Sequence, residues 1–199
     1  MPGSVAIIDG GGANIASLRF ALDRLGRESV LTTDAGLIRA ASHVILPGVG
    51  AARAAMDKLR AAGLDTLIPR LTRPLLGICL GMQLLFDASE EDDTPCLGIF
   101  TGIARRFVPE PGRPVPHMGW NQLHRRVDVP LLDGIDEGAY CYFVHSYALP
   151  VGDTTLASTR YGADFAAVAG HGNFLAAQFH PERSGTVGAR LLENFLTRY

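Results

Sequence analysis

Short apolar runs alternate with helix-spaced segments over roughly the first 86 residues of the chain. Apolar runs predict strands at 4–9, 28–33, 43–46 and 74–79, and a helix is expected after each one. The first of these helices is expected to start at Asn14 as N-cap and to end near Leu25, before Gly26. The remaining helices are expected up to residue 41, over 51–62 and from residue 80. This alternation is typical of a parallel sheet covered by helices on both faces.

The pattern changes after Asp93, where Pro- and Gly-rich loops separate strand-like segments. These segments are expected at 101–108, 121–126, 139–149, 155–160, 165–169 and 174–179. No long helix lies between them, so we expect mostly antiparallel strands, some of which extend the main sheet. A helix over 184–198 closes the chain. The predicted fold class is α/β: one domain, 1–199, with a doubly wound, mostly parallel central sheet, helices on both faces and additional antiparallel strands in the C-terminal half.

Composition and charge exclude several classes of protein. The chain is 47% hydrophobic, carries 18 basic and 20 acidic residues, and has no long run of like charge. We therefore expect no nucleic-acid partner and no binding to a membrane, because no apolar run approaches the roughly 18 residues of a spanning helix. Three cysteines without a C-x-x-C pair, and an N-terminus without a basic leader, favour a reduced cytoplasmic setting.

Cofactor and metal sites are not predicted. The loop Gly10–Gly12 suggests a dinucleotide fingerprint, but the third glycine would have to stand at position 15, which is Ile15. His117 and His124 lie near Trp120 without acids or cysteines at metal-ligand spacing. A tight turn at the sheet edge is the better interpretation of the glycines.

The stretch around Cys79 carries the strongest chemical signal. Gly77 and Gly81 stand two residues on either side of Cys79, at the junction of a predicted strand and helix, which is the thiol version of the G-x-S-x-G nucleophile elbow. A residue that turns directly from strand into helix is forced toward positive φ, and its neighbours must be small. The helix N-terminus then favours a negative charge on the sulfur. A buried structural cysteine is the alternative, and the two glycines favour the nucleophile.

A thiol nucleophile needs a base and a group that orients the base. His180 follows the apolar strand 174–179 and precedes Pro181-Glu182, so Glu182 can accept the Nδ1 proton of the imidazole. We predict Cys79, His180 and Glu182 as nucleophile, general base and acid, and orienting group. The rival pair Cys141 and His145 would lie on one face of a strand but about 13 Å apart, too far for direct proton transfer. The N–H of Leu80, with a donor from the glycine-rich loop 47–50, is expected to form an oxyanion hole.

The combination of motifs resembles the class I glutamine amidotransferases. Gly77-Ile-Cys79-Leu-Gly81-Met-Gln83 followed by His180-Pro-Glu182 identifies the class. Three stretches are similar to the narrower family of glutaminase subunits of imidazole glycerol phosphate synthase: Asp9-Gly-Gly-Gly-Ala-Asn14, Pro116-His-Met-Gly-Trp-Asn121 and Tyr142-Phe-Val-His-Ser-Tyr147.

The resemblance implies a role in histidine biosynthesis. The chain would hydrolyse L-glutamine and pass the ammonia, within a heterodimer, to a (β/α)8-barrel cyclase subunit that makes imidazole glycerol phosphate. It also implies an oxyanion hole made by the N–H groups of Val49 and Leu80. The residues that it implies for glutamine binding are Gly50, Gln83, His145, Ser146 and Tyr147.

Contact with the partner is expected at Asn14 and Tyr142. The family usually carries Tyr after the first Asp and Gly before Asn, where this chain has Gly10 and Ala13, so the loop near the partner differs. Tyr142 is equally well read as a strand residue packed on its neighbours. Three functional alternatives remain: a glutaminase serving another synthase, a free-standing cysteine peptidase or γ-glutamyl hydrolase, and a catalytically silent module on the same fold.

Overall fold

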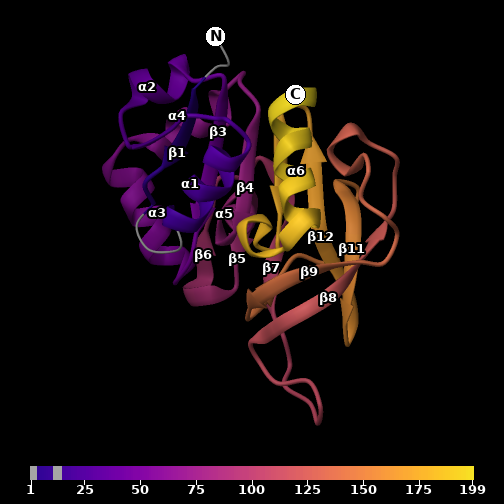
Figure 1. Ribbon diagram of the computed structural model, residues 1–199. Helices are drawn as coiled ribbons and strands as arrows, with labels where there is room; N and C mark the ends of the chain where they lie inside the picture. The colour runs from indigo at the N-terminus through magenta and orange to yellow at the C-terminus, as the bar shows by residue number, and fades with distance from the viewer. Residues whose placement is uncertain (1–3, 11–14) are drawn as a thin grey trace.

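The computed structural model describes residues 4–10 and 15–199, and its main feature is a nine-stranded sheet (Figure 1). Four strands from the first half of the chain lie in the order β2-β1-β3-β4: β1 is Val5–Ile8, β2 is Ser29–Thr32, β3 is His43–Gly48 and β4 is Leu75–Cys79. All four are parallel. This confirms the parallel sheet that the apolar runs predict, and it places the carboxyl ends of β3 and β4 side by side.

Five strands from the second half extend the same sheet. β13 (Phe174–Ala177) lies against β4, followed by β12 (Ala163–His171), β11 (Thr155–Tyr161), β8 (His117–Arg125) and β9 (Ala139–His145). The last four are joined by antiparallel pairs, as expected. The expectation of antiparallel pairing is wrong for β13, which runs parallel to β4. Its antiparallel neighbour β12 is the immediately preceding strand, and that hairpin turns β13 into the direction of β4.

A second, four-stranded sheet was not predicted. Its order is β10-β7-β5-β6, with β10 at Tyr147–Ala148, β7 at Phe100–Arg106, β5 at Phe86–Ser89 and β6 at Thr94–Pro95. The predicted strand 139–149 is divided between the two sheets, because β9 ends at His145 and β10 begins at Tyr147. Residue 146 is therefore the point where the chain passes from one sheet to the other.

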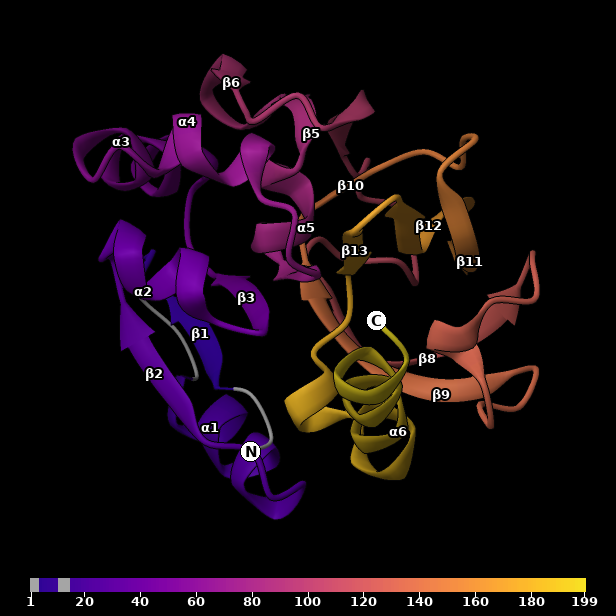
Figure 2. The same cartoon turned by 90° about the horizontal axis from the view of Figure 1, so that it is seen from above.

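Helices cover both faces of the main sheet (Figure 2). On one side α1 (Ile15–Arg24) and α6 (Gly185–Arg198) contribute Leu18, Leu22, Leu191 and Phe195 to a buried cluster. On the other side lie α2 (Ala35–Ala40), α3 (Ala52–Ala61), α4 (Leu64–Leu67) and α5 (Leu80–Leu84). Short 3-10 turns occupy Ile68–Arg70, Glu91–Asp93, Pro130–Leu132 and Pro181–Arg183. None of the helices in 4–10 and 15–199 is long and apolar enough to cross a membrane.

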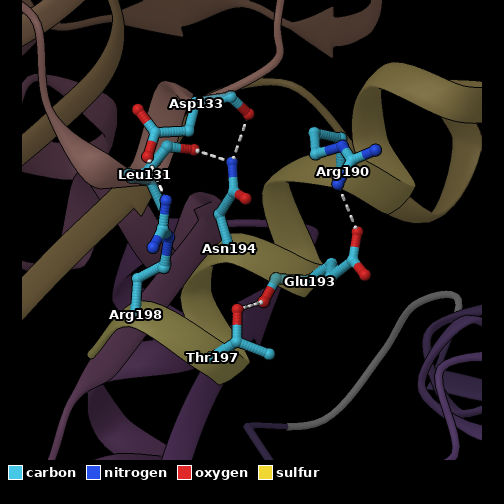
Figure 3. A network of polar contacts seen from close by, with 7 residues as sticks. All are labelled: Leu131, Asp133, Arg190, Glu193, Asn194, Thr197 and Arg198. Carbon is cyan, nitrogen blue, oxygen red and sulfur yellow. Dashed lines mark hydrogen bonds and ion pairs between the residues drawn. The ribbon is translucent and has the colours of Figure 1, made fainter.

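Polar contacts attach α6 to the turn that follows β8 (Figure 3). The Asn194 amide is buried and donates to the carbonyl oxygens of Leu131 and Asp133 at 3.0 and 2.8 Å. Arg198 forms an ion pair with the Asp133 carboxylate at 2.7 Å. Because two carbonyl groups share one buried amide, the rotation of α6 about its axis is fixed relative to this turn.

Candidate active site

Cys79 occupies a strained turn at the end of β4. Its backbone has φ 55° and ψ −111°, a conformation that non-glycine residues rarely adopt. The flanking glycines are required by space: a Cβ on Gly81 would lie 1.8 Å from the carbonyl oxygen of Leu46, and one on Gly77 would lie 2.7 Å from the carbonyl oxygen of Gly81. The geometry fits the predicted nucleophile elbow, in which the sulfur stands at the N-terminus of α5.

His180 and Glu182 lie beside this turn because β13 and β4 are neighbours in the sheet. The His180 Nδ1 atom is 2.9 Å from a Glu182 carboxylate oxygen, and their side chains are only 6% and 4% exposed. Nδ1–H therefore donates to the carboxylate, which leaves Nε2 free to exchange a proton. Burial lowers the pKa of His180, but the neighbouring Cys79 and Glu182 outweigh it and raise the pKa well above its usual range.

Backbone contacts hold the His180 segment against β9 and α6. The N–H of His180 donates to the carbonyl oxygen of Tyr142 at 3.0 Å, and the N–H of Tyr142 donates to the Ser184 hydroxyl at 3.0 Å. That hydroxyl donates to the carbonyl oxygen of His180 at 2.7 Å. Gly188 of α6 lies so close that a Cβ there would be 1.9 Å from the carbonyl oxygen of Pro181. The imidazole is thus positioned by a rigid loop.

The Cys79 sulfur has two polar partners that sequence reasoning did not predict. Its thiol donates to the carbonyl oxygen of Val144 at 3.8 Å, and the Gln178 amide donates to the sulfur at 3.8 Å. Nε2 of His180 is buried without a hydrogen-bond partner of good geometry in the described part of the chain. Catalytic contacts are often loose before substrate binds, and the effect of Cys79 on the pKa of His180 places the thiol close to its base.

A cavity of about 320 Å³ opens over Cys79. It is lined by residues of both sheets and of the loop after β3: Val49, Gly50, Cys79, Leu80, Gln83, Glu91, Pro116, Val144, His145, Ser146 and Tyr147. All of the residues predicted for the oxyanion hole and for glutamine binding are among them. Glu91, Pro116 and Val144 are additions that the sequence did not suggest.

Glu91 brings a carboxylate to the wall of this cavity. One of its oxygens accepts the backbone N–H of Ala52 at 2.7 Å, at the start of α3, where the helix has no side-chain cap of its own. The residue belongs to an acidic run, Glu90–Asp93, that in a sequence is typical of a solvated turn. Its contact with a helix 39 residues away could not be read from local pattern.

Two predicted glutamine-binding side chains are already engaged within the protein. The Gln83 amide donates to the carbonyl oxygen of Tyr147 at 2.9 Å and to the side-chain oxygen of Gln178 at 3.1 Å. The His145 ring contacts the Tyr147 carbonyl oxygen at 2.8 Å and His117 at 3.1 Å. These side chains therefore shape the cavity wall.

The structure also bears on the rival thiol pair, the predicted partner contacts and metal binding. Burial raises the pKa of Cys141 to about 12, which disfavours its thiolate, so the rival pair with His145 has no activated thiol. Tyr142 is half-buried, with its ring 6.0 Å from that of Trp120 and the Arg183 guanidinium 4.7 Å from its centroid. Asn14 lies outside the described residues. Among those described, no three His, Cys, Asp or Glu side chains gather in a metal-binding arrangement.

Comparison with known proteins identifies the family of the chain. The family model of class I glutamine amidotransferases matches residues 7–199. The imidazole glycerol phosphate synthase subunit HisH 2 of Legionella pneumophila (strain Lens) is 54% identical over 193 residues, 97% of each chain. The corresponding HisH subunit of Xanthomonas axonopodis pv. citri (strain 306) is 54% identical over 192 residues, 96% of each chain.

Solved structures share the fold at much lower identity. A crystal structure described as a glutamine amidotransferase superposes with a TM-score of 0.76 at 22% identity, covering 98% of this chain and 97% of the other. At that identity the likeness supports the α/β architecture alone. The family of the chain is shown by the family model and by the two HisH relatives. The chain belongs to the class I glutamine amidotransferases and, within them, to the HisH subunits of imidazole glycerol phosphate synthase.

Proposed function

We propose that this glutaminase hydrolyses L-glutamine with Cys79 as nucleophile, His180 as general base and acid and Glu182 as the group that orients His180. We also propose that it delivers the ammonia to a (β/α)8-barrel cyclase subunit. The observation that carries the proposal is the buried His180–Glu182 pair beside a strained cysteine at the floor of a cavity. A structural cysteine would need neither the strain nor the charged pair.

The reaction proceeds through a thioester. The raised pKa of His180 favours transfer of the thiol proton to Nε2, so the sulfur attacks the side-chain amide carbon of glutamine as a thiolate beside the imidazolium. The N–H groups of Val49 and Leu80 stabilise the resulting oxyanion. When the C–N bond breaks, His180 returns the proton to the leaving nitrogen and ammonia departs. His180 then takes a proton from water, whose oxygen attacks the thioester carbon, and the proton passes to the sulfur as glutamate is released.

The cavity offers complementary groups for the amino-acid end of glutamine. The Glu91 carboxylate provides the negative charge that an α-ammonium group requires, since its contact with Ala52 uses only one of its two oxygens. Backbone groups of Gly50, Ser146 and Tyr147 at the same wall are suited to the α-carboxylate. Both charges of the zwitterion are then matched without a basic side chain.

Docking of the cyclase subunit is proposed on the outer face of β8 and β9. Trp120 and Met118 are 55% and 67% exposed, and in the strand register they oppose Tyr142 and Val144. Val144 lines the cavity, so this apolar face runs up to the active site. Tyr142 in turn bonds the His180 segment through its backbone, so a partner seated on this face contacts a strand that holds the base.

The first test is release of glutamate from L-glutamine by the chain alone, with the cyclase, and with cyclase plus its nucleotide substrate. Strong activation only in the complete mixture supports a partner-gated subunit, whereas full activity alone would favour a free-standing hydrolase. Cys79→Ser should abolish glutamine hydrolysis and leave ammonia-dependent synthesis by the complex intact. Cys96→Ser, at a partly buried cysteine outside the cavity, is the matched control. Substantial glutaminase activity in Cys79→Ser would refute the assigned nucleophile.

A second test addresses the docking face. Trp120 is the one tryptophan of the sequence, so its fluorescence reports titration with the cyclase directly. Tyr142→Ala should weaken the complex, and Leu37→Ala, which removes an exposed apolar side chain on α2, should not. Unchanged Trp120 fluorescence at saturating cyclase would place the interface elsewhere.

A further inference from the structure

We infer that His117 and His145 form a pair of neutral rings, each in a defined tautomer with its proton on Nδ1. We also infer that this pair positions the Tyr147 side of the glutamine cavity. The inference rests on the proposed cavity and adds two positioning residues to it. His117 belongs to the segment Pro116–Asn121 and has no role in the proposed mechanism.

The pair is the middle of a chain of hydrogen bonds that begins at Asn121. The Asn121 side-chain nitrogen lies 3.2 Å from His117 Nε2 and 3.0 Å from the carbonyl oxygen of Arg160. His117 Nδ1 lies 3.1 Å from His145 Nε2. His145 Nδ1 lies 2.8 Å from the carbonyl oxygen of Tyr147. Three consecutive contacts thus link β8, β9 and β10, and the contact of Asn121 with Arg160 adds β11.

The groups at the two ends of this series of hydrogen bonds fix the position of every proton in it. A carbonyl oxygen only accepts, so His145 Nδ1 must carry a proton, and in a neutral ring His145 Nε2 is then an acceptor. His117 Nδ1 must therefore donate to it, which leaves His117 Nε2 as an acceptor. The Asn121 side-chain oxygen accepts the N–H of Gln122 at 2.8 Å, so its NH2 group faces His117, as required. One additional proton on either ring would set two donors against each other.

The surroundings keep both rings neutral. His117 and His145 are 4% and 6% exposed, and burial lowers the pKa of His117 to about 4 and that of His145 to about 3. Aromatic rings surround them: Phe107, Phe143, Tyr161 and Phe165. His117 and His180 each disfavour a proton on His145 further and so lower its pKa.

A series of hydrogen bonds through Tyr147 connects the histidine pair with the nucleophile. The Tyr147 carbonyl oxygen accepts from His145 on one side and from the Gln83 amide on the other. Gln83 donates its second proton to Gln178, whose own amide donates to the Cys79 sulfur. Tyr147 and Ser146 line the cavity, so a displaced Tyr147 carbonyl would move the wall that receives glutamine.

Nuclear magnetic resonance of the chain labelled with ¹⁵N-histidine tests the proton order directly. We expect both rings to be protonated at Nδ1 and not at Nε2 at pH 7, and to stay so at pH 5.5. Signals are assigned by their loss in His117→Phe and His145→Phe. An Nε2-protonated or charged ring at position 117 or 145 at pH 7 would overturn the inference.

Steady-state kinetics of the complex with the cyclase and its nucleotide test the positioning role. His117→Phe keeps an aromatic ring but removes the donor to His145. We expect the KM for glutamine to rise about tenfold while kcat changes less than about twofold, as for loss of one buried hydrogen bond that shapes a binding wall. His117→Asn retains a donor near the Nδ1 position and should recover most of the loss.

His124→Phe is the matched control, because His124 lies on the same strand and pairs with Glu137 at the surface. A KM that is unchanged in His117→Phe, or that rises equally in His124→Phe, would overturn the positioning role. Activity retained by Cys79→Ser would instead refute the proposed mechanism and leave the proton order of the pair unaffected. The two failures are therefore distinguishable.

Discussion

Gly81→Ala is the substitution that tests the elbow most directly. The added Cβ would lie 1.8 Å from the Leu46 carbonyl oxygen of β3, and real Cβ atoms essentially never approach a heavy atom closer than 3.0 Å. The difference, 3.0 − 1.8 = 1.2 Å, is the least distance by which α5 and β3 must separate. Neither contact partner is a flexible side chain, so the backbone itself has to move.

The displacement has two consequences of predictable size. Overpacking of this kind costs about 3 kcal/mol of unfolding free energy. For a chain of this length that corresponds to a fall in Tm of about 6–12 °C. Leu80 and Cys79 begin α5, so a movement of about 1 Å also misplaces the sulfur and the proposed oxyanion donor. Misplacement of this size lowers kcat about 100-fold.

The assay combines thermal unfolding with glutamate release by the activated complex. Gly152→Ala is the control, because a Cβ there has no heavy atom within 4 Å and needs no unusual backbone angle. We expect the control to match wild type in both measurements. Wild-type Tm and kcat in Gly81→Ala would refute the argument that close approach of α5 and β3 positions the nucleophile.

Three further predictions concern the base, the C-terminal helix and pH. Glu182→Gln removes a charge that raises the pKa of His180, so kcat should fall about 10²- to 10⁴-fold and alkylation of Cys79 should shift in pH dependence, whereas Glu193→Gln should not do either. Asn194→Ala removes the donor to one buried and one partly buried carbonyl group and should cost about 1–3 kcal/mol in thermal unfolding, whereas Arg190→Ala at an exposed ion pair should cost almost nothing. The pKa values of His117 and His145 are lowered to about 4 and about 3 in the folded chain. As the pH is lowered from about 6.5 to 4, the unfolded chain therefore binds protons before the folded chain does, and the urea concentration at the unfolding midpoint should decrease. His180, with a raised pKa, has the opposite effect near pH 6.5, where the folded chain holds a proton that the unfolded chain partly lacks. Well below pH 6.5 it is protonated in both states and adds no slope, so His117→Phe should show a shallower fall there.

The sequence predicts those parts of the fold where one local pattern determines one element. Four apolar runs followed by helical spacing correspond to β1 to β4, and the predicted ends agree with the structure within a few residues. The second sheet was missed because α5 ends at Leu84 and β5 begins at Phe86, so one uninterrupted apolar stretch contains a strand, a helix and another strand. Periodicity over so few residues cannot divide them.

The candidate site shows the same division. Cys79, His180 and Glu182 can be recognised from the flanking glycines and the short spacing of the last two. Gln178 directly follows the apolar strand β13, and Glu91 lies in an acidic turn. Their contacts with Cys79 and Ala52 span 99 and 39 residues. Such pairings arise from the tertiary packing of β13 beside β4 and of the second sheet beside α3. Gln178 does leave one signal in the sequence, because it is the one polar residue in the apolar segment 174–179.

The position of β13 between β4 and β12 also determines the order in which the enzyme can be completed on the ribosome. Cys79 is synthesised 174 − 79 = 95 residues before β13 begins, which at bacterial rates is about 5–20 s. During that interval β4 is an open edge whose apolar side chains lack their final neighbour, a state prone to pairing with other chains. The thiol meanwhile has no base. Nascent chains, and fragments that end before His180, therefore cannot release ammonia by this chemistry, and they carry the exposed edge that quality-control proteases and chaperones recognise.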